Sequence, residues 1–246
     1  MSVRYKLVIE YDGTGFVGWQ SQTNGLSVQF VLEGAALAFT GLPCPSIAAG
    51  RTDAGVHALG QVAHLDLPRA YPAQTVRDAL NFHMKPHPVA VRTAQEASPD
   101  FHARFSARER RYLYRILNRN TAPVLDRHRV WWVSHALNEA RMAEAATHLV
   151  GRHDFSTFRA SQCQAKTAEK TLEELVVTRQ GEEIHIRARA RSFLHHQVRN
   201  MVGSLKWVGE GKWTPDDLRQ ALEARDRTAG GPTAPAEGLY LTEVIY

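Results

Sequence analysis

The sequence predicts an α+β fold built from two similar halves, with sheets that are at least partly antiparallel. Stretches in which polar and apolar residues alternate, as in half-buried strands, are interspersed with stretches of helical apolar spacing. The order strand–loop–helix–strand–helix–strand recurs in outline in both halves, although no internal sequence repeat is evident. The length of 246 residues and the hydrophobic fraction of 43% suit a globular protein with one large or two smaller domains. A cleft between the halves is the expected binding site.

The first half opens with a strand and a helix. Residues 4–11 alternate as a strand and end in the loop signal Tyr11-Asp-Gly-Thr-Gly15. Ser27 is a suitable N-cap for a helix whose apolar residues continue to Phe39, and Gly41-Leu-Pro ends it. The remaining elements expected in this half are a strand at 61–67, a helix at 75–82 and a strand at 89–94.

The second half begins with a strand at 110–117, and we expect the domains to be residues 1–105 and 106–246. A hairpin is predicted around Gln180-Gly181, between strands at 172–179 and 183–191. Thr214 and Pro215 are a cap and first residue for another helix. The other elements expected here are helices at 138–150 and 193–208, loops at 151–158 and 229–238, and a strand at 239–246.

Composition narrows the class of protein. No apolar run approaches the roughly 18 residues of a membrane helix, and the N-terminus has no signal-peptide core. Two cysteines, Cys44 and Cys163, are too few for a disulfide framework and lack metal-ligand spacing. We therefore expect a cytoplasmic protein. The net charge of +5 is weak evidence for a nucleic-acid partner by itself.

One carboxylate is presented in an unusual setting. The run Ala49-Gly-Arg-Thr-Asp-Ala-Gly-Val-His-Ala58 places Asp53 between two glycines and beside Arg51. Glycine lets a ligand approach the main chain, and arginine is suited to phosphate. A reactive acid offered to a polyanionic substrate and an ordinary turn acid are both compatible with this run alone.

The distribution of positive charge indicates RNA. Guanidinium groups with interleaved aromatic rings can hold phosphates and stack on bases, which favours an RNA-facing role over a merely solvated strand face. The segment in question contains six arginines and four aromatic residues: Arg104, Arg108, Arg110, Arg111, Arg115, Arg119, Phe101, Phe105, Tyr112 and Tyr114.

Histidines raise the possibility of a metal site, which we do not expect. His57, His195 and His196 lack a well-spaced third partner. The last two are predicted to lie on a helix, where adjacent residues face different directions. Glycines in the segment from Tyr11 to Gln22 resemble a phosphate loop, but no Lys-Ser/Thr follows, which argues against a nucleotide-binding P-loop.

Taken together, these motifs closely resemble the tRNA pseudouridine synthase A family from the first strand to the last. The family often carries arginine where this chain has Lys166 and Lys170. The matching segments are Gly50-Arg-Thr-Asp-Ala-Gly-Val-His-Ala58, Tyr11-Asp-Gly-Thr-Gly-Phe-Val-Gly-Trp-Gln-Ser-Gln22, Phe101-His-Ala-Arg-Phe-Ser-Ala107, Arg111-Tyr-Leu-Tyr114, Arg191-Ser-Phe-Leu-His-His-Gln-Val-Arg-Asn-Met-Val-Gly203 and Ala234-Pro-Ala-Glu-Gly-Leu-Tyr-Leu241.

The resemblance implies isomerisation of uridine to pseudouridine at positions 38, 39 and 40 of the tRNA anticodon arm. It further implies a homodimer and no cofactor. Each protomer would have two α/β-sandwich-like domains that share a mixed, largely antiparallel central sheet, with a basic cleft between them.

It also assigns roles to residues. Asp53 would act on a flipped uridine as a nucleophile toward ribose or base, or would remove the 2′ proton; these accounts stay open. Tyr112 would stack on the target base and assist loss of the C5 proton. Burial raises the pKa of a carboxylate unless a cation compensates, and Arg199 would be that cation. Arg51 would replace the flipped nucleotide or hold its phosphate. The expected RNA contacts are Phe101, His102, Ala103, Arg104, Phe105 and Lys166.

Two other functions compete with an isomerase. A non-catalytic RNA-binding protein would gain nothing from an acid facing phosphate, which disfavours it. A carboxylate hydrolase would ordinarily need a second acid near the first. Asp66 is the nearest candidate, and it lies in a predicted strand without glycine-rich presentation.

Overall fold

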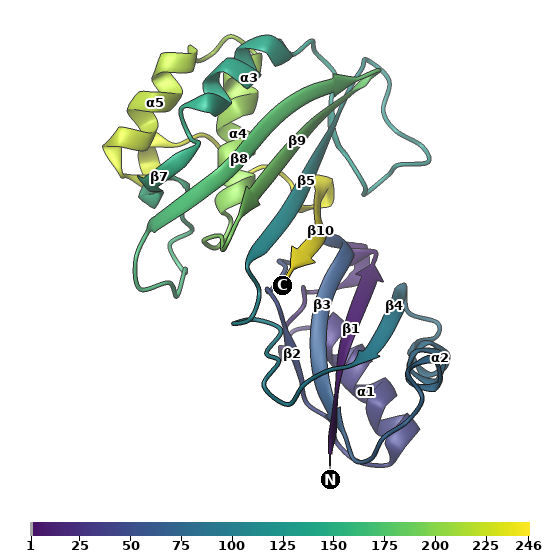
Figure 1. Ribbon diagram of the computed structural model, residues 1–246. Helices are drawn as coiled ribbons and strands as arrows, with labels where there is room; N and C mark the ends of the chain where they lie inside the picture. The colour runs from purple at the N-terminus through teal and green to yellow at the C-terminus, as the bar shows by residue number, and fades with distance from the viewer. Residues whose placement is uncertain (1) are drawn as a thin grey trace. The chain divides into compact units, whose positions relative to one another are not determined.

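The computed structural model describes residues 2–246 as two compact units (Figure 1). The first unit runs to Arg108 and also contains Tyr240–Tyr246, and the second is Glu109–Leu239. The predicted division into domains 1–105 and 106–246 stays a prediction.

The first unit is a sheet covered by two helices (Figure 1). Its strands lie in the order β4-β1-β3-β10, and β2 also pairs with β3. Burial of Tyr5, Leu7 and Ile9 on one face of β1 reflects the alternation in the sequence. The elements are β1 (Val3–Tyr11), α1 (Val28–Thr40), β2 (Ser46–Ala48), β3 (His57–Leu67), α2 (Ala73–Met84), β4 (Val89–Glu96) and β10 (Leu239–Ile245).

The second unit has a sheet in the order β5-β9-β8-β7, with β6 beside β5. Three helices accompany it, and α3 packs against β8, α4 and α5. The elements are β5 (Glu109–Asn118), β6 (Trp131–Val133), α3 (Glu139–Thr147), β7 (Gly151–Asp154), β8 (Glu169–Gln180), β9 (Glu183–Ala190), α4 (Gln197–Gly209) and α5 (Pro215–Ala224).

The predicted α+β class, with mixed and largely antiparallel strand pairing, is confirmed. In the units as described, β10 runs parallel to β3 and β6 runs parallel to β5. The pairs β1–β3, β1–β4, β2–β3, β5–β9, β7–β8 and β8–β9 are antiparallel. The basic cleft stays a prediction.

Local sequence signals correctly predicted where α1 begins and ends, where α5 begins, and where the β8–β9 hairpin turns. The Ser27 hydroxyl accepts a hydrogen bond from the Phe30 amide at the start of α1, and Gly41 ends that helix in the left-handed conformation. Thr214 and Asp217 form a capping box at α5. The hairpin of β8 and β9 turns at Gly181, whose φ is 61°.

Other boundaries were wrong. The predicted helix 138–150 ends at Thr147, and Gly151, with φ of 114°, begins strand β7 in the predicted loop. Strand β3 begins at His57 rather than residue 61. A Cβ at Gly60 would lie 2.4 Å from the Thr242 carbonyl oxygen, so this glycine permits the close approach of β10 to β3.

The predicted helix 193–208 begins only at Gln197. Its cap, His196, has a φ of 60°, and the Leu194 amide donates to the Gln197 side-chain oxygen rather than to a helical carbonyl. The Gln197 amide donates to the Leu194 carbonyl at 3.1 Å, so residues 194–197 form a tight turn at the start of α4.

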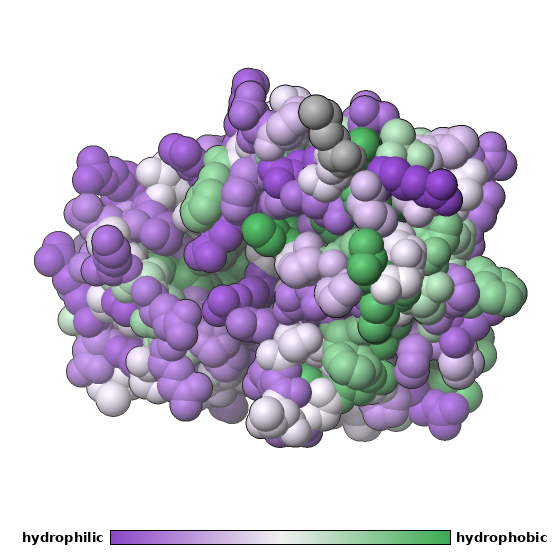
Figure 2. Space-filling model, turned by 90° about the horizontal axis from the view of Figure 1, so that it is seen from below, coloured by the Kyte–Doolittle hydropathy of each residue, from purple (hydrophilic) through white to green (hydrophobic). Residues whose placement is uncertain are grey.

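Figure 2 shows one face on which hydrophilic side chains predominate, with smaller hydrophobic groups between them. Exposed aromatic residues include Phe30, Phe82 and Phe105. Within residues 2–246, no helix is both long enough and apolar enough to cross a bilayer.

Candidate active site

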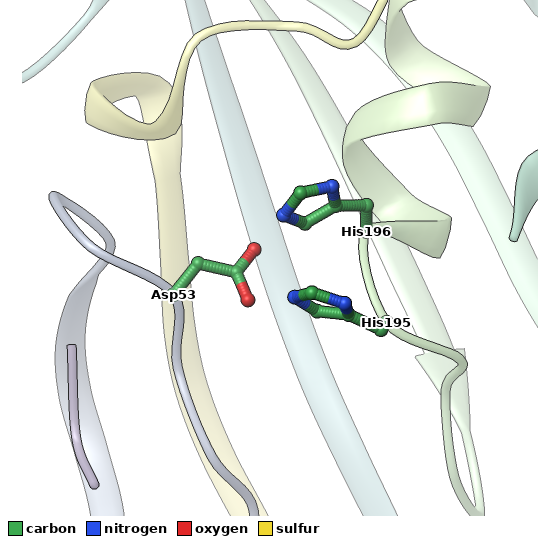
Figure 3. Close-up of side chains that lie close together, drawn as sticks. All are labelled: Asp53, His195 and His196. Carbon is green, nitrogen blue, oxygen red and sulfur yellow. The ribbon is translucent and has the colours of Figure 1, made fainter. Parts of the chain in front are cut away.

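Asp53 lies on the connection between β2 and β3 in the first unit. Its backbone forms an isolated antiparallel bridge with Gly18, and its side chain is half-buried. Figure 3 shows its carboxylate projecting from this connection. The acid is thus held by the main chain on both sides of its loop, as expected of a side chain presented by a rigid scaffold.

Residues 12–19 support the Asp53 connection through main-chain hydrogen bonds. The Trp19 amide donates to the Thr52 carbonyl at 3.0 Å, and the Gly55 amide donates to the Phe16 carbonyl at 3.3 Å. The buried Tyr11 and Thr52 hydroxyls are 2.8 Å apart. The first glycine-rich segment therefore holds the acid-bearing loop in place, a role that its resemblance to a phosphate loop did not suggest.

Glycine is required at specific points of this support. Gly18 has a φ of 109°, and a Cβ there would lie 2.6 Å from the Thr52 carbonyl oxygen. A Cβ at Gly13 would lie 2.1 Å from the Val56 carbonyl oxygen. Gly55 has a φ of 78°, a left-handed conformation that favours glycine. Gly50 does not have a positive φ, and a Cβ there would meet no heavy atom within 4 Å. Gly50 thus leaves space beside Arg51 instead of permitting an unusual backbone.

His57 is a structural residue. Its ring is buried, its Nδ1 accepts a hydrogen bond from the Gly13 amide at 3.0 Å, and it stacks on Tyr240 with ring centroids 4.8 Å apart. Asp12 also approaches Nδ1, at 3.3 Å. His57 thus joins the supporting loop to β3 and β10 within the first unit.

Arg51 and Asp66 differ in their surroundings. Arg51 is exposed, two residues before the candidate acid. Asp66 receives hydrogen bonds from Arg4 at 2.8 Å on both carboxylate oxygens. The hydrogen bond from Arg4 lowers the pKa of Asp66, which makes this carboxylate an ion-pair partner on the sheet. This argues against a hydrolase that would use Asp66 as its second acid.

The segment Phe101–Phe105 is a compact turn in which side chains hold the backbone. His102 Nδ1 accepts hydrogen bonds from the Arg104 and Phe105 amides, each at 3.2 Å. The Phe105 ring lies against His102 with centroids 4.4 Å apart, and 72% of the Phe105 residue surface is exposed. The Arg104 guanidinium lies 5.6 Å from the Phe105 ring centroid. An aromatic face and a cation are therefore presented together.

Ala103 differs from its neighbours because it is fully buried. Its amide donates to His64 Nδ1 at 3.1 Å, and its carbonyl accepts from the Tyr246 hydroxyl at 2.7 Å. Burial lowers the pKa of His64 to about 4, consistent with a neutral ring that accepts this bond. The backbone of Ala103 thus supports the turn, and the expected RNA contact at this residue stays a prediction. Phe101 packs on Tyr246 at 4.9 Å.

In the second unit, β5 carries two tyrosines with different environments. Tyr114 is fully buried, its hydroxyl donates to the Pro235 carbonyl at 2.7 Å, and burial raises its pKa well above the usual value. Tyr112 is only half-buried, and its ring meets Phe193 edge-on with centroids 5.1 Å apart. Tyr114 is thus the core tyrosine, and Tyr112 is the one with accessible surface.

Arg199 projects from the first turn of α4. Its Nε donates to the Ala234 carbonyl at 2.8 Å, and the Ala234 amide donates to the Arg199 carbonyl at 3.1 Å. The loop containing Ala234 packs closely on the helix, since a Cβ at Gly203 would lie 1.7 Å from the Pro232 carbonyl oxygen. The half-buried guanidinium is thereby held by a backbone contact that the sequence did not reveal.

The adjacent histidines correct one expectation. His195 and His196 lie on the turn before α4 (Figure 3), and their ring centroids are only 4.1 Å apart. Adjacent side chains on a helix face different directions. The prediction that His195 and His196 lie on a helix was therefore wrong. The expected absence of metal and cofactor stays a prediction. Lys166 is exposed in the loop before β8.

The predicted residues thus fall into separate groups within the two units. Arg51 and Asp53 share one loop, and the turn 101–105 forms another group in the first unit. Tyr112, Arg199 and Lys166 belong to the second unit, where Phe193 joins Tyr112. The supporting positions that the sequence reasoning missed, such as Gly13, Gly18 and Ala234, act through backbone contacts.

Comparison with known proteins identifies relatives along the whole chain. A family model described as tRNA pseudouridine synthase matches residues 7–106 and 145–246. The protein named tRNA pseudouridine synthase A from Paramagnetospirillum magneticum is 68% identical over 99% of this chain and 95% of its own. Proteins of the same name from Rhodospirillum rubrum and Rhodospirillum centenum are 63% and 61% identical over 99% of this chain, and over 88% and 99% of their own.

Proposed function

Because the chain belongs to the tRNA pseudouridine synthase family, a family of isomerases, we propose that it converts uridine to pseudouridine at positions 38, 39 and 40 of the tRNA anticodon arm. In this reaction the bond from ribose C1′ to uracil N1 breaks and a bond from C1′ to C5 forms. One proton leaves C5 and one is gained at N1, so product and substrate are isomers. Asp53 is the proposed nucleophile on a flipped uridine.

The observation that supports this role most strongly is the anchored position of Asp53. Its backbone is bridged to Gly18, and the residues on either side of it, Thr52 and Ala54, belong to a loop that the segment 12–19 holds by hydrogen bonds. A nucleophile gains rate when its position is set before the substrate arrives. An acid in a freely solvated turn would not need such support.

Three further residues are proposed to handle the target nucleotide. Tyr112 stacks on the extruded uracil, because it is the half-buried tyrosine of β5 and its ring rests on Phe193. Arg199 balances the charge of the catalytic carboxylate. Arg51, which is exposed on the Asp53 loop, takes the place of the extruded nucleotide or binds its phosphate. Extrusion costs a few kcal/mol, so contacts that replace the lost stacking are needed.

RNA outside the target nucleotide is proposed to contact the turn 101–105 and Lys166. Phe105 offers an exposed ring that is backed by His102, and Arg104 lies over the same ring. Stacking of bases on aromatic rings and contacts between arginine and phosphate are the usual means of binding unpaired RNA.

The protein is also proposed to act as a homodimer. Sedimentation velocity on the purified chain, with and without tRNA, measures this directly. A single species of monomer mass at concentrations that support activity would contradict the dimer.

The test of the proposed function is conversion of an unmodified tRNA in the presence of a chelator and without nucleotide. Wild-type protein is expected to form pseudouridine at positions 38–40, mapped position by position. Asp53→Ala is expected to form none and to bind the tRNA as before. Asp66→Asn, which removes the other candidate acid, is expected to retain conversion.

Conversion that survives in Asp53→Ala would overturn the assignment of Asp53. Tight tRNA binding by the wild-type protein without any product would favour a binding protein instead. Product that is lost on chelation and restored by added metal would overturn the expectation that no metal is needed.

A further inference from the structure

A pocket with three basic residues in its lining lies in the second unit, where β7 pairs with the start of β8 and β9 ends. Its cavity volume is about 410 Å³. Register places Arg152 of β7 opposite Thr171 of β8, and Leu172 opposite Ala190, so Arg191 follows directly beside this row. Arg152, Lys170, Thr171, Arg191 and Ser192 contribute to its lining.

Some charged residues that line this pocket form ion pairs, and others do not. Glu169 is engaged by Arg152 at 3.1 Å, and Glu173 is engaged by Arg189 at 3.0 Å. Across residues 2–246, by contrast, Lys170 and Arg191 have no carboxylate within 4.0 Å of their side-chain nitrogens. Two cations are therefore available to a ligand.

The lining indicates the chemical class of that ligand. Only polar and charged residues line the pocket, among them the hydroxyl-bearing Thr171 and Ser192. Lysine, arginine and hydroxyl groups are the usual partners of nucleic-acid phosphates.

The pocket is also connected to the proposed stacking tyrosine. Arg191 and Ser192 immediately precede Phe193, whose ring packs edge-on against Tyr112. The Arg191 carbonyl accepts a hydrogen bond from Arg110 at 2.5 Å, which ties this segment to β5 within two residues of Tyr112. An RNA strand whose base reaches Tyr112 would extend its backbone along the same segment.

We propose that this pocket binds a backbone phosphate of the tRNA away from the target nucleotide, with Lys170 and Arg191 as its ligands. The inference rests on the proposed function for the identity of the RNA. The pocket is proposed to position the tRNA. It therefore contributes to tRNA affinity and to the salt dependence of that affinity, and the rate of the chemical step does not depend on it.

The experiment measures binding of an unmodified anticodon-arm RNA by the full chain at several salt concentrations. Lys170→Ala and Arg191→Ala are each expected to weaken binding about three- to tenfold and to reduce the salt slope by about 0.7–0.9, as expected for one lost phosphate contact. Lys170→Arg and Arg191→Lys, which keep the positive charge, should retain most of the affinity and of the salt slope. For all four variants, kcat at saturating RNA should remain at the wild-type value.

Arg187→Ala is the matched control, because Arg187 is an exposed arginine on β9 four residues before Arg191. The inference is overturned if the Lys170 and Arg191 variants bind like the wild type, or if Arg187→Ala loses as much affinity and slope as they do. Pseudouridine formation by the wild type is measured separately. Failure there would overturn the proposed function, while the binding series would still decide whether this pocket holds phosphate.

Discussion

Substitution of Gly18 by alanine should impair catalysis without removing any side chain from the candidate site. Gly18 has a φ of 109°, and its new Cβ would lie 2.6 Å from the Thr52 carbonyl oxygen and 3.1 Å from the Asp53 carbonyl carbon. Both partners are backbone atoms, so relief requires movement of the loop that carries Asp53.

The size of the effect follows from this geometry. A non-glycine residue in such a backbone conformation costs about 1–3 kcal/mol, and the contact with Thr52 adds to it. We expect the free energy of unfolding to fall by about 2–4 kcal/mol. Because displacement of a reacting group by about 1 Å can cost on the order of 100-fold in rate, kcat should fall about 10- to 100-fold.

The assay compares kcat, KM for tRNA and urea unfolding at a temperature at which the variant is folded. Gly15→Ala is the matched control, since Gly15 lies in the same segment and a Cβ there would meet nothing within 4 Å. It should behave like the wild type. A wild-type kcat in Gly18→Ala would refute the claim that this segment positions Asp53.

The remaining predictions concern RNA contacts and stability. Phe105→Ala should weaken tRNA binding about 5- to 150-fold, the value of one stacked base, while Phe105→Tyr should bind normally in a filter-binding assay. Tyr112→Phe should retain tRNA affinity and Tyr112→Ala should lose it; equal losses would exclude stacking as the main role. Burial opposes ionisation of Glu210, but hydrogen bonds from Lys206, His135 and Lys212 lower its pKa to about 2. Because the folded pKa lies below the unfolded value of 4.5, its stabilisation is present above about pH 4.5 and is lost as pH falls toward 2. Glu210→Gln should therefore lower the free energy of unfolding by about 1–3 kcal/mol at pH 7, and urea titrations at lower pH should show the difference shrinking.

Local sequence signals were sufficient where a short segment determines its own conformation. The caps of α1 and α5 and the turn at Gly181 depend on neighbouring residues, and each was predicted. The boundaries that were predicted wrongly depend on contacts with residues outside the local segment. Strand β3 passes through Gly60 because β10, far along the chain, packs against it. The turn before α4 depends on the Gln197 side chain and on the left-handed His196.

In the candidate site, too, local features were predicted from the sequence and contacts between distant segments were not. The spacing of glycines around Asp53 indicated a special loop, and the resemblance pointed to Tyr112 and Arg199. The sequence did not reveal that residues 12–19 hold that loop or that Ala234 holds Arg199, because these are main-chain contacts between distant segments. It also could not separate buried Ala103 from exposed Phe105, since their burial depends on His64 and Tyr246.

The central claim is that the chemistry depends on the Asp53 carboxylate. The most direct measurement is single-turnover formation of pseudouridine with enzyme in excess over tRNA, for the wild type and for the nearly isosteric Asp53→Asn. The account predicts product at positions 38–40 with the wild type, and none with Asp53→Asn despite equal tRNA binding. Product formation by Asp53→Asn at a rate comparable to that of the wild type would contradict it.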